Sequence, residues 1–198
     1  KTVLVGVPGA FTPTCSENHV PGFIEAASSL EAENVTSLVV LSVNDRFVMK
    51  AWDQSLGLET LRTADGSNGG LKPEVIADGR GIVAAALGLL VDKGDMGARC
   101  KRTALVIDEG KVVYVGIDEA GLDTSSAESV LQFLKEDREA KEKAAKEKAE
   151  AEAKAKADAL AAAETGQGGD MDESQKKLAI GAVIAVALLG LVSQLFKL

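Results

Sequence analysis

The chain has few of the residues on which disulfide-rich and metal-binding proteins depend. Its 198 residues include two Cys and one His. Two thiols in a chain of this length do not make a disulfide framework, which favours a reducing compartment. One His and no Cys-x-x-Cys motif leave too few ligands for a metal site, so we expect neither a metal nor a cofactor.

Positive charge is also scarce. The formal net charge is −8, and Lys and Arg are not gathered apart from acidic residues, which argues against binding to nucleic acid. The length allows one ordinary domain plus extensions, or two small domains. Because Lys1 runs straight into a strand-like segment, we expect further residues before it, where any N-terminal targeting signal would lie.

The most informative residue present is Cys15, which follows a Thr-Pro-Thr turn and precedes a helical pattern over 16–33. Unpaired backbone N–H groups and the helix dipole create positive potential at a helix start. That potential favours the thiolate, the nucleophilic form of cysteine. The alternative is a buried, inert thiol, since free Cys is among the most buried residue types. We favour the reactive interpretation, because Pro8 and Pro13 flank this site.

Three collinear blocks carry a resemblance to a known family. They are Val-Pro-Gly-Ala-Phe-Thr-Pro-Thr-Cys-Ser (7–16) with His-Val-Pro-Gly-Phe (19–23), Leu-Ser-Val-Asn-Asp (41–45) with Phe-Val-Met-Lys-Ala-Trp (47–52), and Lys-Arg followed by Ala-Leu-Val-Ile-Asp (101–108). Over about residues 1–134 the chain resembles the type II (atypical two-cysteine) peroxiredoxins, which have a redoxin domain. The resemblance implies an α/β thioredoxin-like fold, a central mixed sheet flanked by helices.

The local patterns agree with an alternation of strands and helices. They predict strands over 2–7, 37–43, 103–108 and 112–117, and helices over 16–33, 45–55, 80–89 and from Ser125 or Ser126 to Leu134. Asn44 or Asp45 caps the second helix, and Glu109-Gly110 makes a tight hairpin turn. Residues 60–73 are rich in Gly, Asn and Ser, and we interpret them as an inserted surface loop. A partner-binding loop is the alternative.

Composition changes abruptly after Leu134. Residues 138–164 are almost wholly Ala, Lys and Glu, with several Glu–Lys pairs four residues apart, each worth about 0.2–0.5 kcal/mol in a helix. We therefore predict a long charged helix over 135–164 that acts as a solvated spacer, with disorder as the alternative. No apolar heptad supports a coiled coil. Residues 165–177 are predicted to form a flexible linker.

Residues 178–196 are the one long hydrophobic run, with only Ser193 and Gln194 polar. About 20 such residues cross a bilayer. We predict a C-terminal transmembrane anchor in an unassigned membrane, with the preceding domain facing the cytosol. A buried core helix is one alternative, but no remaining domain is available to bury it. A helix lying on the membrane is the other, but this run has no polar face.

The resemblance implies the chemistry. Cys15 would attack a hydroperoxide, and the Thr12 hydroxyl would point at the peroxide or the sulfur. Pro8 would shield the site and help to bind the substrate. Arg102 would stabilise the thiolate and hydrogen-bond both peroxide oxygens. Without the resemblance, Arg102 is indistinguishable from the other arginines.

His19 lies one helical turn after Cys15, on the same face. The resemblance makes it a supporting residue that forms a structural hydrogen bond. A Cys–His pair, with His19 as general base, is the alternative.

A sulfenic acid on Cys15 must be reduced through a disulfide. Related proteins with an internal resolving cysteine carry it where this chain has Val40 or Thr124. The only other thiol is Cys100, which strand alternation would place on one face with Arg102. A Cys15–Cys100 disulfide is therefore a hypothesis. We prefer a one-cysteine cycle in which glutathione/glutaredoxin or thioredoxin reduces Cys15.

The sequence thus predicts a thiol-dependent peroxidase that reduces hydrogen peroxide and alkyl hydroperoxides. Dimerisation is implied by the resemblance alone. A membrane-tethered peroxide sensor, which passes oxidation to a partner thiol, is the second hypothesis. A structural membrane protein with an inactive redoxin domain is the third, and the presence of Thr12, Cys15 and Arg102 argues against it.

Overall fold

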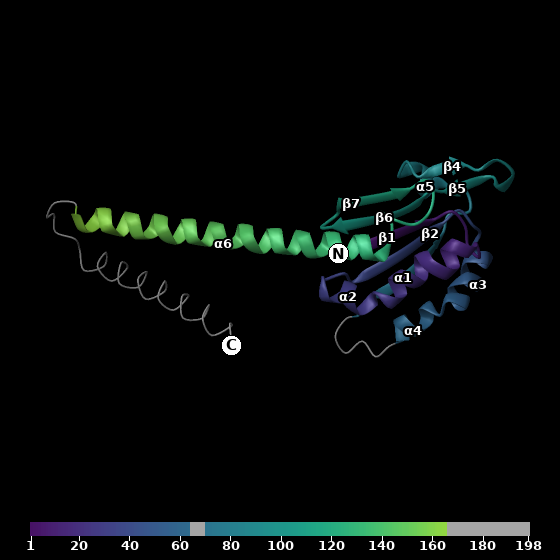
Figure 1. Ribbon diagram of the computed structural model, residues 1–198, viewed down its shortest axis with the longest axis horizontal. Coiled ribbons are helices and arrows are strands. Elements are labelled where there is room, and N and C mark those ends of the chain that lie inside the picture. Colours follow the sequence, from purple (N-terminus) through teal and green to yellow (C-terminus); the bar gives the residue numbers. More distant parts are fainter. Residues whose placement is uncertain (64–69, 166–198) are drawn as a thin grey trace. The chain divides into compact units, whose positions relative to one another are not determined.

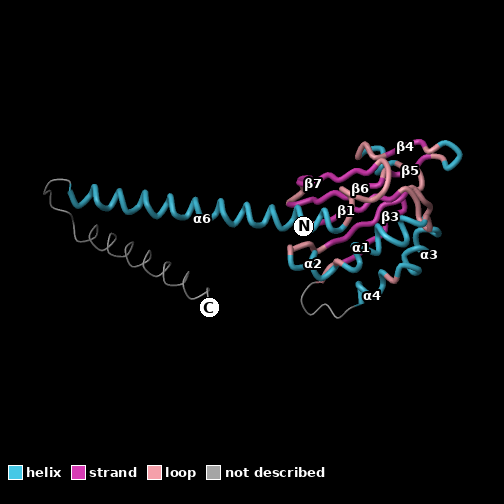
Figure 2. Tube along the Cα trace, in the orientation of Figure 1, coloured by secondary structure: helices cyan, strands magenta, loops and turns pink. Residues whose placement is uncertain are grey.

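The computed structural model describes residues 1–63 and 70–165 (Figures 1 and 2). Contacts divide the chain into two units, Lys1–Arg138 and Glu139–Leu198. The first unit contains the sheet and all the predicted site residues. The second is described here only as far as residue 165.

A five-stranded sheet forms the centre of the first unit (Figure 2). Its strands are β1 (Thr2–Val7), β2 (Ser37–Ser42), β3 (Lys72–Ala77), β6 (Arg102–Asp108) and β7 (Lys111–Asp118), in the order β3-β2-β1-β6-β7. Strands β1, β2 and β3 are parallel, whereas β6 is antiparallel to both β1 and β7. The valine-rich β1 and β2 are buried on both faces, as expected for central strands. The mixed sheet confirms the thioredoxin-like α/β class.

Successive side chains along the strands point to opposite faces of the sheet, where they form two separate hydrophobic cores. Helices α1 (Val20–Glu25), α2 (Ala27–Ala32) and α3 (Arg46–Leu56) cover one face, together with the first turns of α6 (Ala127–Thr165). This first core contains Val3, Val5, Val7, Cys15, Phe23, Leu30, Trp52, Val130 and Leu134. The short helix α5 (Ile82–Ala86) lies on the opposite face. The second core contains Leu4, Val39, Leu41, Ala84, Leu89, Cys100 and Leu105.

Two predicted local signals are confirmed. The side chain of Asp45 caps α3 by accepting hydrogen bonds from the backbone N–H groups of Phe47 and Val48, at 2.8 and 3.1 Å. Glu109 and Gly110 adopt positive φ values of 49° and 77°, which is the twist that a two-residue hairpin between β6 and β7 requires.

The helix predicted over 16–33 is divided into three pieces. A π-helical turn, η1 (Cys15–His19), precedes α1, and α1 and α2 are separated at Ala26. The backbone N–H of Val20 donates to the Cys15 carbonyl, five residues earlier. Pro21 has no N–H to donate to Glu17, so the α-helical ladder is broken where the wider turn forms. Such turns are frequent at functional sites.

The loop interpretation of residues 60–73 is wrong at both ends. Helix α4 (Leu58–Thr63) reaches into this range, and β3 already begins at Lys72. Arg62 holds the helix to the strand, since its guanidinium bonds the Asp53 carboxylate at 2.6 Å and donates from Nε to the Pro73 carbonyl at 2.8 Å. Pro73 is tolerated because β3 is an edge strand.

Three further elements between α5 and β6 differ from the sequence prediction. The helix expected over 80–89 is only the five-residue α5. After it come β4 (Leu90–Asp92), the 3₁₀ turn η2 (Gly94–Met96) and β5 (Ala98–Cys100), and β4 and β5 pair as a separate two-stranded sheet. Short exposed strands of this kind carry little apolar periodicity, so the sequence did not predict them.

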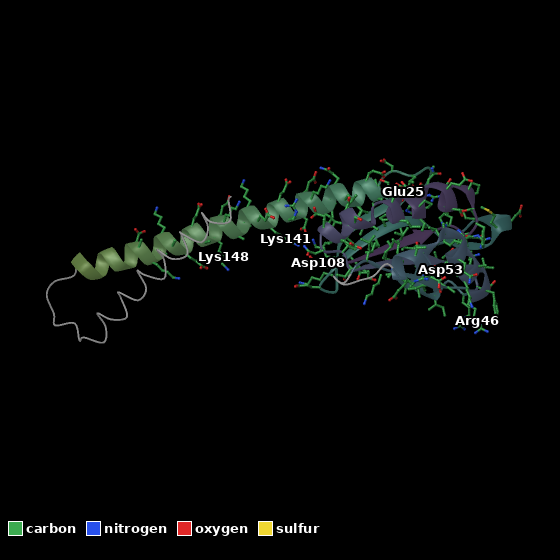
Figure 3. The ribbon with its side chains drawn as sticks, turned by 90° about the horizontal axis from the view of Figure 1, so that it is seen from below. Glu25, Arg46, Asp53, Asp108, Lys141 and Lys148 are labelled. Carbon is green, nitrogen blue, oxygen red and sulfur yellow. The ribbon has the colours of Figure 1, made fainter. Side chains whose placement is uncertain are left out.

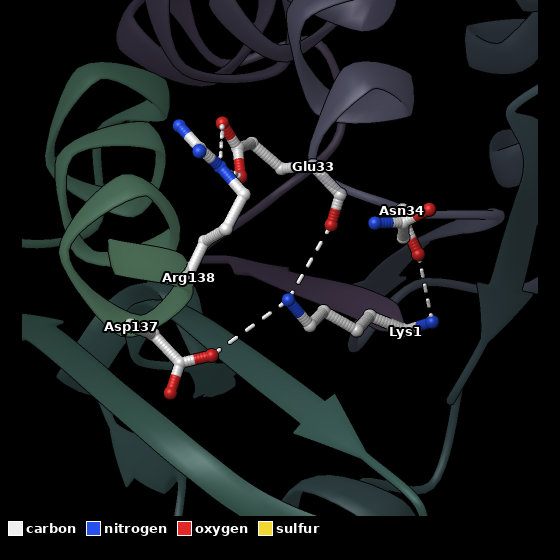
Figure 4. Close-up of polar contacts among 5 residues, drawn as sticks. All are labelled: Lys1, Glu33, Asn34, Asp137 and Arg138. Carbon is white, nitrogen blue, oxygen red and sulfur yellow. Dashed lines mark hydrogen bonds and ion pairs between the residues drawn. The ribbon is translucent and has the colours of Figure 1, made fainter. Parts of the chain in front are cut away.

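Helix α6 joins two predicted segments, the last helix of the domain and the charged spacer, into one run of 39 residues. Its first turns bury Val130 and Leu134 in the first core. Figure 4 shows the polar contacts at the end of the first unit, where Arg138 pairs with Glu33 at 3.1 Å and Lys1 with Asp137 at 3.7 Å.

Beyond Arg138 the helix is charged and exposed up to Asp158, with Lys141 and Lys148 projecting from it (Figure 3). The predicted anchor over 178–196, and the predicted linker after residue 165, lie outside the described residues. Within residues 1–63 and 70–165, no helix combines the length and the apolar character needed to cross a bilayer.

Candidate active site

Cys15 and Arg102 meet on the first-core face of the sheet. Cys15 is the first residue of η1 and is 0% exposed. Arg102 begins β6, and its Nη1 donates a hydrogen bond to the Cys15 Sγ at 3.6 Å. The guanidinium is permanently charged and carries several donors, so it stabilises a thiolate and leaves N–H groups for a ligand.

His19, the last residue of η1, lies between Arg102 and the backbone of Ser125. Its Nε2 is 2.9 Å from the Ser125 carbonyl oxygen, and its Nδ1 is 3.3 Å from Arg102 Nη1. A carbonyl only accepts, so Nε2 carries the proton and Nδ1 accepts from the guanidinium. With its lone pair occupied by Arg102, the imidazole is placed to orient Arg102 and not to deprotonate Cys15.

The pKa of His19 is lowered to about 4, chiefly by burial and also by the positive charge of Arg102. The hydrogen bond to Ser125 and the negative charge of Asp118 act in the opposite direction but are outweighed. His19 is therefore neutral at pH 7, as its bond from Arg102 requires.

Thr12 and Pro8 lie in the loop between β1 and η1. The Thr12 hydroxyl donates to the Gly9 carbonyl at 2.8 Å, so its proton braces the loop and its lone pairs remain available to a donor. From the sequence, this hydroxyl was expected to point at the peroxide or the sulfur, and in the structure its proton goes to the Gly9 carbonyl instead. Pro8 and Arg102 both line a cavity of about 550 Å³, which the β4–β5 hairpin and residues 118–121 complete.

Two side chains that hold this loop and the start of η1 in place, Asn44 and Trp52, had no chemical role predicted from the sequence. Asn44 Oδ1 accepts from the Ala10 backbone N–H at 3.0 Å and from the Ser42 hydroxyl at 2.7 Å. Trp52 Nε1 donates to the Ser16 hydroxyl at 2.9 Å, directly beside Cys15. The only sequence signal was the position of both residues in the second family-like block.

Cys100 lies on the other face of the sheet, in the second core. A Cβ atom placed on Gly6 of β1 would stand 2.9 Å from the Cys100 Sγ, whereas Val5 and Val7 point to the first core with Cys15. The expectation that Cys100 and Arg102 share a face is wrong, because Lys101 interrupts the chain between β5 and β6. Burial and the charge of Asp78 raise the pKa of the Cys100 thiol to about 12, which keeps it protonated.

Acid is expected to destabilise the protein through His19. The unfolded imidazole titrates near pH 6.5 and the folded one near 4, so between these values the unfolded state binds more protons and stability falls as the pH is lowered. At pH 5 the expected loss is roughly 2 kcal/mol, at about 1.4 kcal/mol per pKa unit.

Urea unfolding at pH 7 and pH 5 measures this loss. In His19→Gln the drop between the two pH values should be smaller by about the same amount. An equal drop in the variant and in the unmodified protein would contradict the assignment to His19.

Comparisons with known proteins place this site in a family. The Redoxin family model matches residues 1–131. Peroxiredoxin-2C of Oryza sativa subsp. japonica is 46% identical over 137 residues, which cover 68% of this chain and 78% of that protein. Chloroplastic peroxiredoxin-2E-2 of the same species is 44% identical over 139 residues, and the chain spans only 57% of its length.

A solved structure agrees with these matches. Reduced Prx3 from Vibrio vulnificus in complex with H₂O₂ has a TM-score of 0.60 and 38% identity, and the match covers 68% of this chain and 78% of that one. The buried Cys15 thiol beside the Arg102 guanidinium, on a thioredoxin-like domain, is consistent with a thiol-based oxidoreductase. The chain belongs to the peroxiredoxins, the thiol-dependent peroxidases of the Redoxin family.

Proposed function

We propose that this protein reduces hydrogen peroxide and alkyl hydroperoxides by the one-cysteine cycle of a type II peroxiredoxin. The observation that carries the proposal is the 3.6 Å contact between Arg102 Nη1 and the Sγ of the buried Cys15. Enclosed donors beside a nucleophile stabilise charge far better than donors in water do.

In the first step the Cys15 thiolate attacks one oxygen of the hydroperoxide. The S–O bond forms as the O–O bond breaks, and the leaving oxygen takes a proton from solvent and departs as water or an alcohol, while the attacked oxygen keeps its own proton. Arg102 donates to both oxygens while charge moves between them, and the Thr12 oxygen accepts from the peroxide O–H. Cys15 is oxidised to a sulfenic acid.

Reduction needs two thiols from outside the chain. A thiol of glutathione, glutaredoxin or thioredoxin attacks the sulfenic sulfur, and water leaves as a mixed disulfide forms. A second thiol then attacks that disulfide and releases Cys15 as a thiol. The position and the raised pKa of Cys100 support this external route, because the central sheet lies between the two thiols.

Peroxide consumption by the full chain in detergent, with glutathione/glutaredoxin and separately with thioredoxin, tests the cycle. Sustained turnover is expected with one of these donors, and Cys100→Ser should keep the rate within about twofold, since Cys100 takes no part. A 15–100 cross-link found by mass spectrometry after peroxide treatment would contradict the one-cysteine cycle. A protein that reacts once and stops with both donors would favour the sensor hypothesis.

We further propose that residues 178–196 anchor the protein in a membrane with the peroxidase domain in the cytosol. The support is the uncharged composition of this run. Release of the full chain from membranes by alkaline carbonate would overturn the anchor.

A homodimer is also proposed. Phe11, in the loop that contains Thr12, is 55% exposed, and Phe47, in the first turn of α3, is 70% exposed, so both offer large apolar groups to a second copy. Sedimentation velocity of the full chain in detergent distinguishes monomer from dimer.

A further inference from the structure

We infer that Asp118 is a positioning residue that holds Arg102 against Cys15, acting through the segment 119–126 and His19. This inference deepens the proposed function and rests on it. It depends on an unbroken series of contacts from the end of β7 to the thiol.

Both carboxylate oxygens of Asp118 are occupied by the segment that follows it. Oδ2 accepts from the backbone N–H of Asp123 at 2.9 Å, and from the N–H and hydroxyl of Ser125 at 3.0 and 2.6 Å. Oδ1 accepts from the N–H and hydroxyl of Thr124 at 3.0 and 2.7 Å. Five donors on three successive residues, 123–125, therefore depend on a single side chain.

The electrostatics of Asp118 agree with this role. Burial alone raises the pKa of Asp118, but the hydrogen bonds from Asp123, Ser125 and Thr124 outweigh it and hold the pKa well below the usual range. The carboxylate is thus charged at every pH at which the enzyme is assayed. Although Arg102 is its register partner across β6 and β7, the hydrogen bonds of Asp118 go to the loop.

The loop also lies directly on β7. A Cβ on Gly116 would stand 2.1 Å from the Thr124 carbonyl oxygen and 3.1 Å from the Ser125 nitrogen, so only glycine permits this approach. Tyr114 donates its hydroxyl to the same Thr124 carbonyl at 2.5 Å. Strand β7 therefore fixes where the backbone of Ser125 stands.

The carbonyl of Ser125 connects this loop to the active site through His19. It accepts from His19 Nε2 at 2.9 Å and so selects the tautomer whose Nδ1 accepts from Arg102 at 3.3 Å. The same Nη1 lies 3.6 Å from the Cys15 Sγ. If the loop moves, His19 loses its tautomer preference and Arg102 loses one of its two anchors near the sulfur.

His19 gives a direct readout, because it is the only histidine in the chain. In the full chain labelled with ¹⁵N-histidine, a long-range ¹H–¹⁵N spectrum shows one imidazole and reports its tautomer and titration. The unmodified protein should show the Nε2–H form, neutral at pH 7. In Asp118→Asn the amide places a donor among donors, so a mixture of tautomers is expected. The Asp118 charge and the Ser125 hydrogen bond both raise the pKa of His19, so their loss should leave the imidazole neutral at pH 7.

The rate constant of Cys15 with hydrogen peroxide should fall roughly 10- to 100-fold in Asp118→Asn, since small misplacements of a stabilising group have effects of this size. Ser125→Ala removes only one hydroxyl bond and should shift both readouts less, in the same direction. It keeps the test decisive if Asp118→Asn does not fold.

The matched control is Asp45→Asn, which also weakens a carboxylate that accepts backbone N–H groups but lies outside the Asp118–His19 series. It should leave the His19 spectrum unchanged and the rate within twofold. Folded Asp118→Asn or Ser125→Ala with the unmodified His19 spectrum and rate would overturn the inference. If the His19 spectrum changes in Asp118→Asn but the unmodified protein itself shows no peroxidase activity, Asp118 remains the positioning residue and the proposed function is refuted instead.

Discussion

Replacing Cys15 by Ser should lower the rate of peroxide consumption by on the order of a thousandfold or more, because a neutral hydroxyl is a far weaker nucleophile than a thiolate. Serine fits the site, and its oxygen can accept the bond that Arg102 gives to the sulfur. The variant is therefore expected to fold. Peroxide remaining after a single turnover, measured with a ferrous-dye assay, gives the result.

The matched control is Cys100→Ser, which changes the other buried thiol of the chain in the same way. It should consume peroxide like the unmodified protein. Mass spectrometry should find the sulfenic acid, or its trapped adduct, on Cys15 in the unmodified protein. Activity that survives in Cys15→Ser would refute the assigned nucleophile.

Arg102→Met should lower the second-order rate constant with hydrogen peroxide by roughly 100- to 1000-fold, the usual effect of removing one donor aimed at developing charge. Arg102→Lys should recover only part of this loss. A single ammonium lacks the fork of N–H groups that lets Arg102 contact His19 Nδ1 and the Cys15 Sγ together.

Trp52 offers a measurement of this rate without any coupling enzyme. It is the only Trp, and its indole N–H bonds the hydroxyl of Ser16, the residue after Cys15. Its fluorescence should change as Cys15 is oxidised in a stopped-flow experiment. Arg99→Lys, a change of the same kind on β5, should react at the unmodified rate. Equal rates in Arg99→Lys and Arg102→Lys would contradict the role given to Arg102.

The sequence predicted the central elements of this fold because they carry strong local signals. Each of these signals is a sequence pattern with a known physical basis: the valine-rich runs of β1 and β2, the Asp45 helix cap and the Glu109-Gly110 turn. The edge strand β3 has no such local signal, because Gly70 and Pro73 are residues that disfavour strands. Its pairing with β2 is decided by tertiary contacts.

The site shows a similar division. Cys15 is marked by its own turn, and Arg102 by the family-like block that contains it. The face on which Cys100 lies depends on Lys101, which belongs to neither β5 nor β6. In a continuous strand, side chains would have alternated between the two faces without this shift, and Cys100 would have shared a face with Arg102. The Ser125 carbonyl is a backbone group, so no residue type could have indicated that it selects the tautomer of His19.

The complete burial of Cys15 has a consequence for the second half of the cycle. A disulfide joins sulfurs about 2.05 Å apart, and a protein thiol cannot come so close to a side chain that is 0% exposed. The η1 turn must therefore open after each oxidation. If opening requires about 1.4 kcal/mol, roughly one molecule in ten is open at any moment. The stability of that one turn, already weakened by Pro21, sets how the enzyme divides its time between meeting peroxide and meeting its reductant.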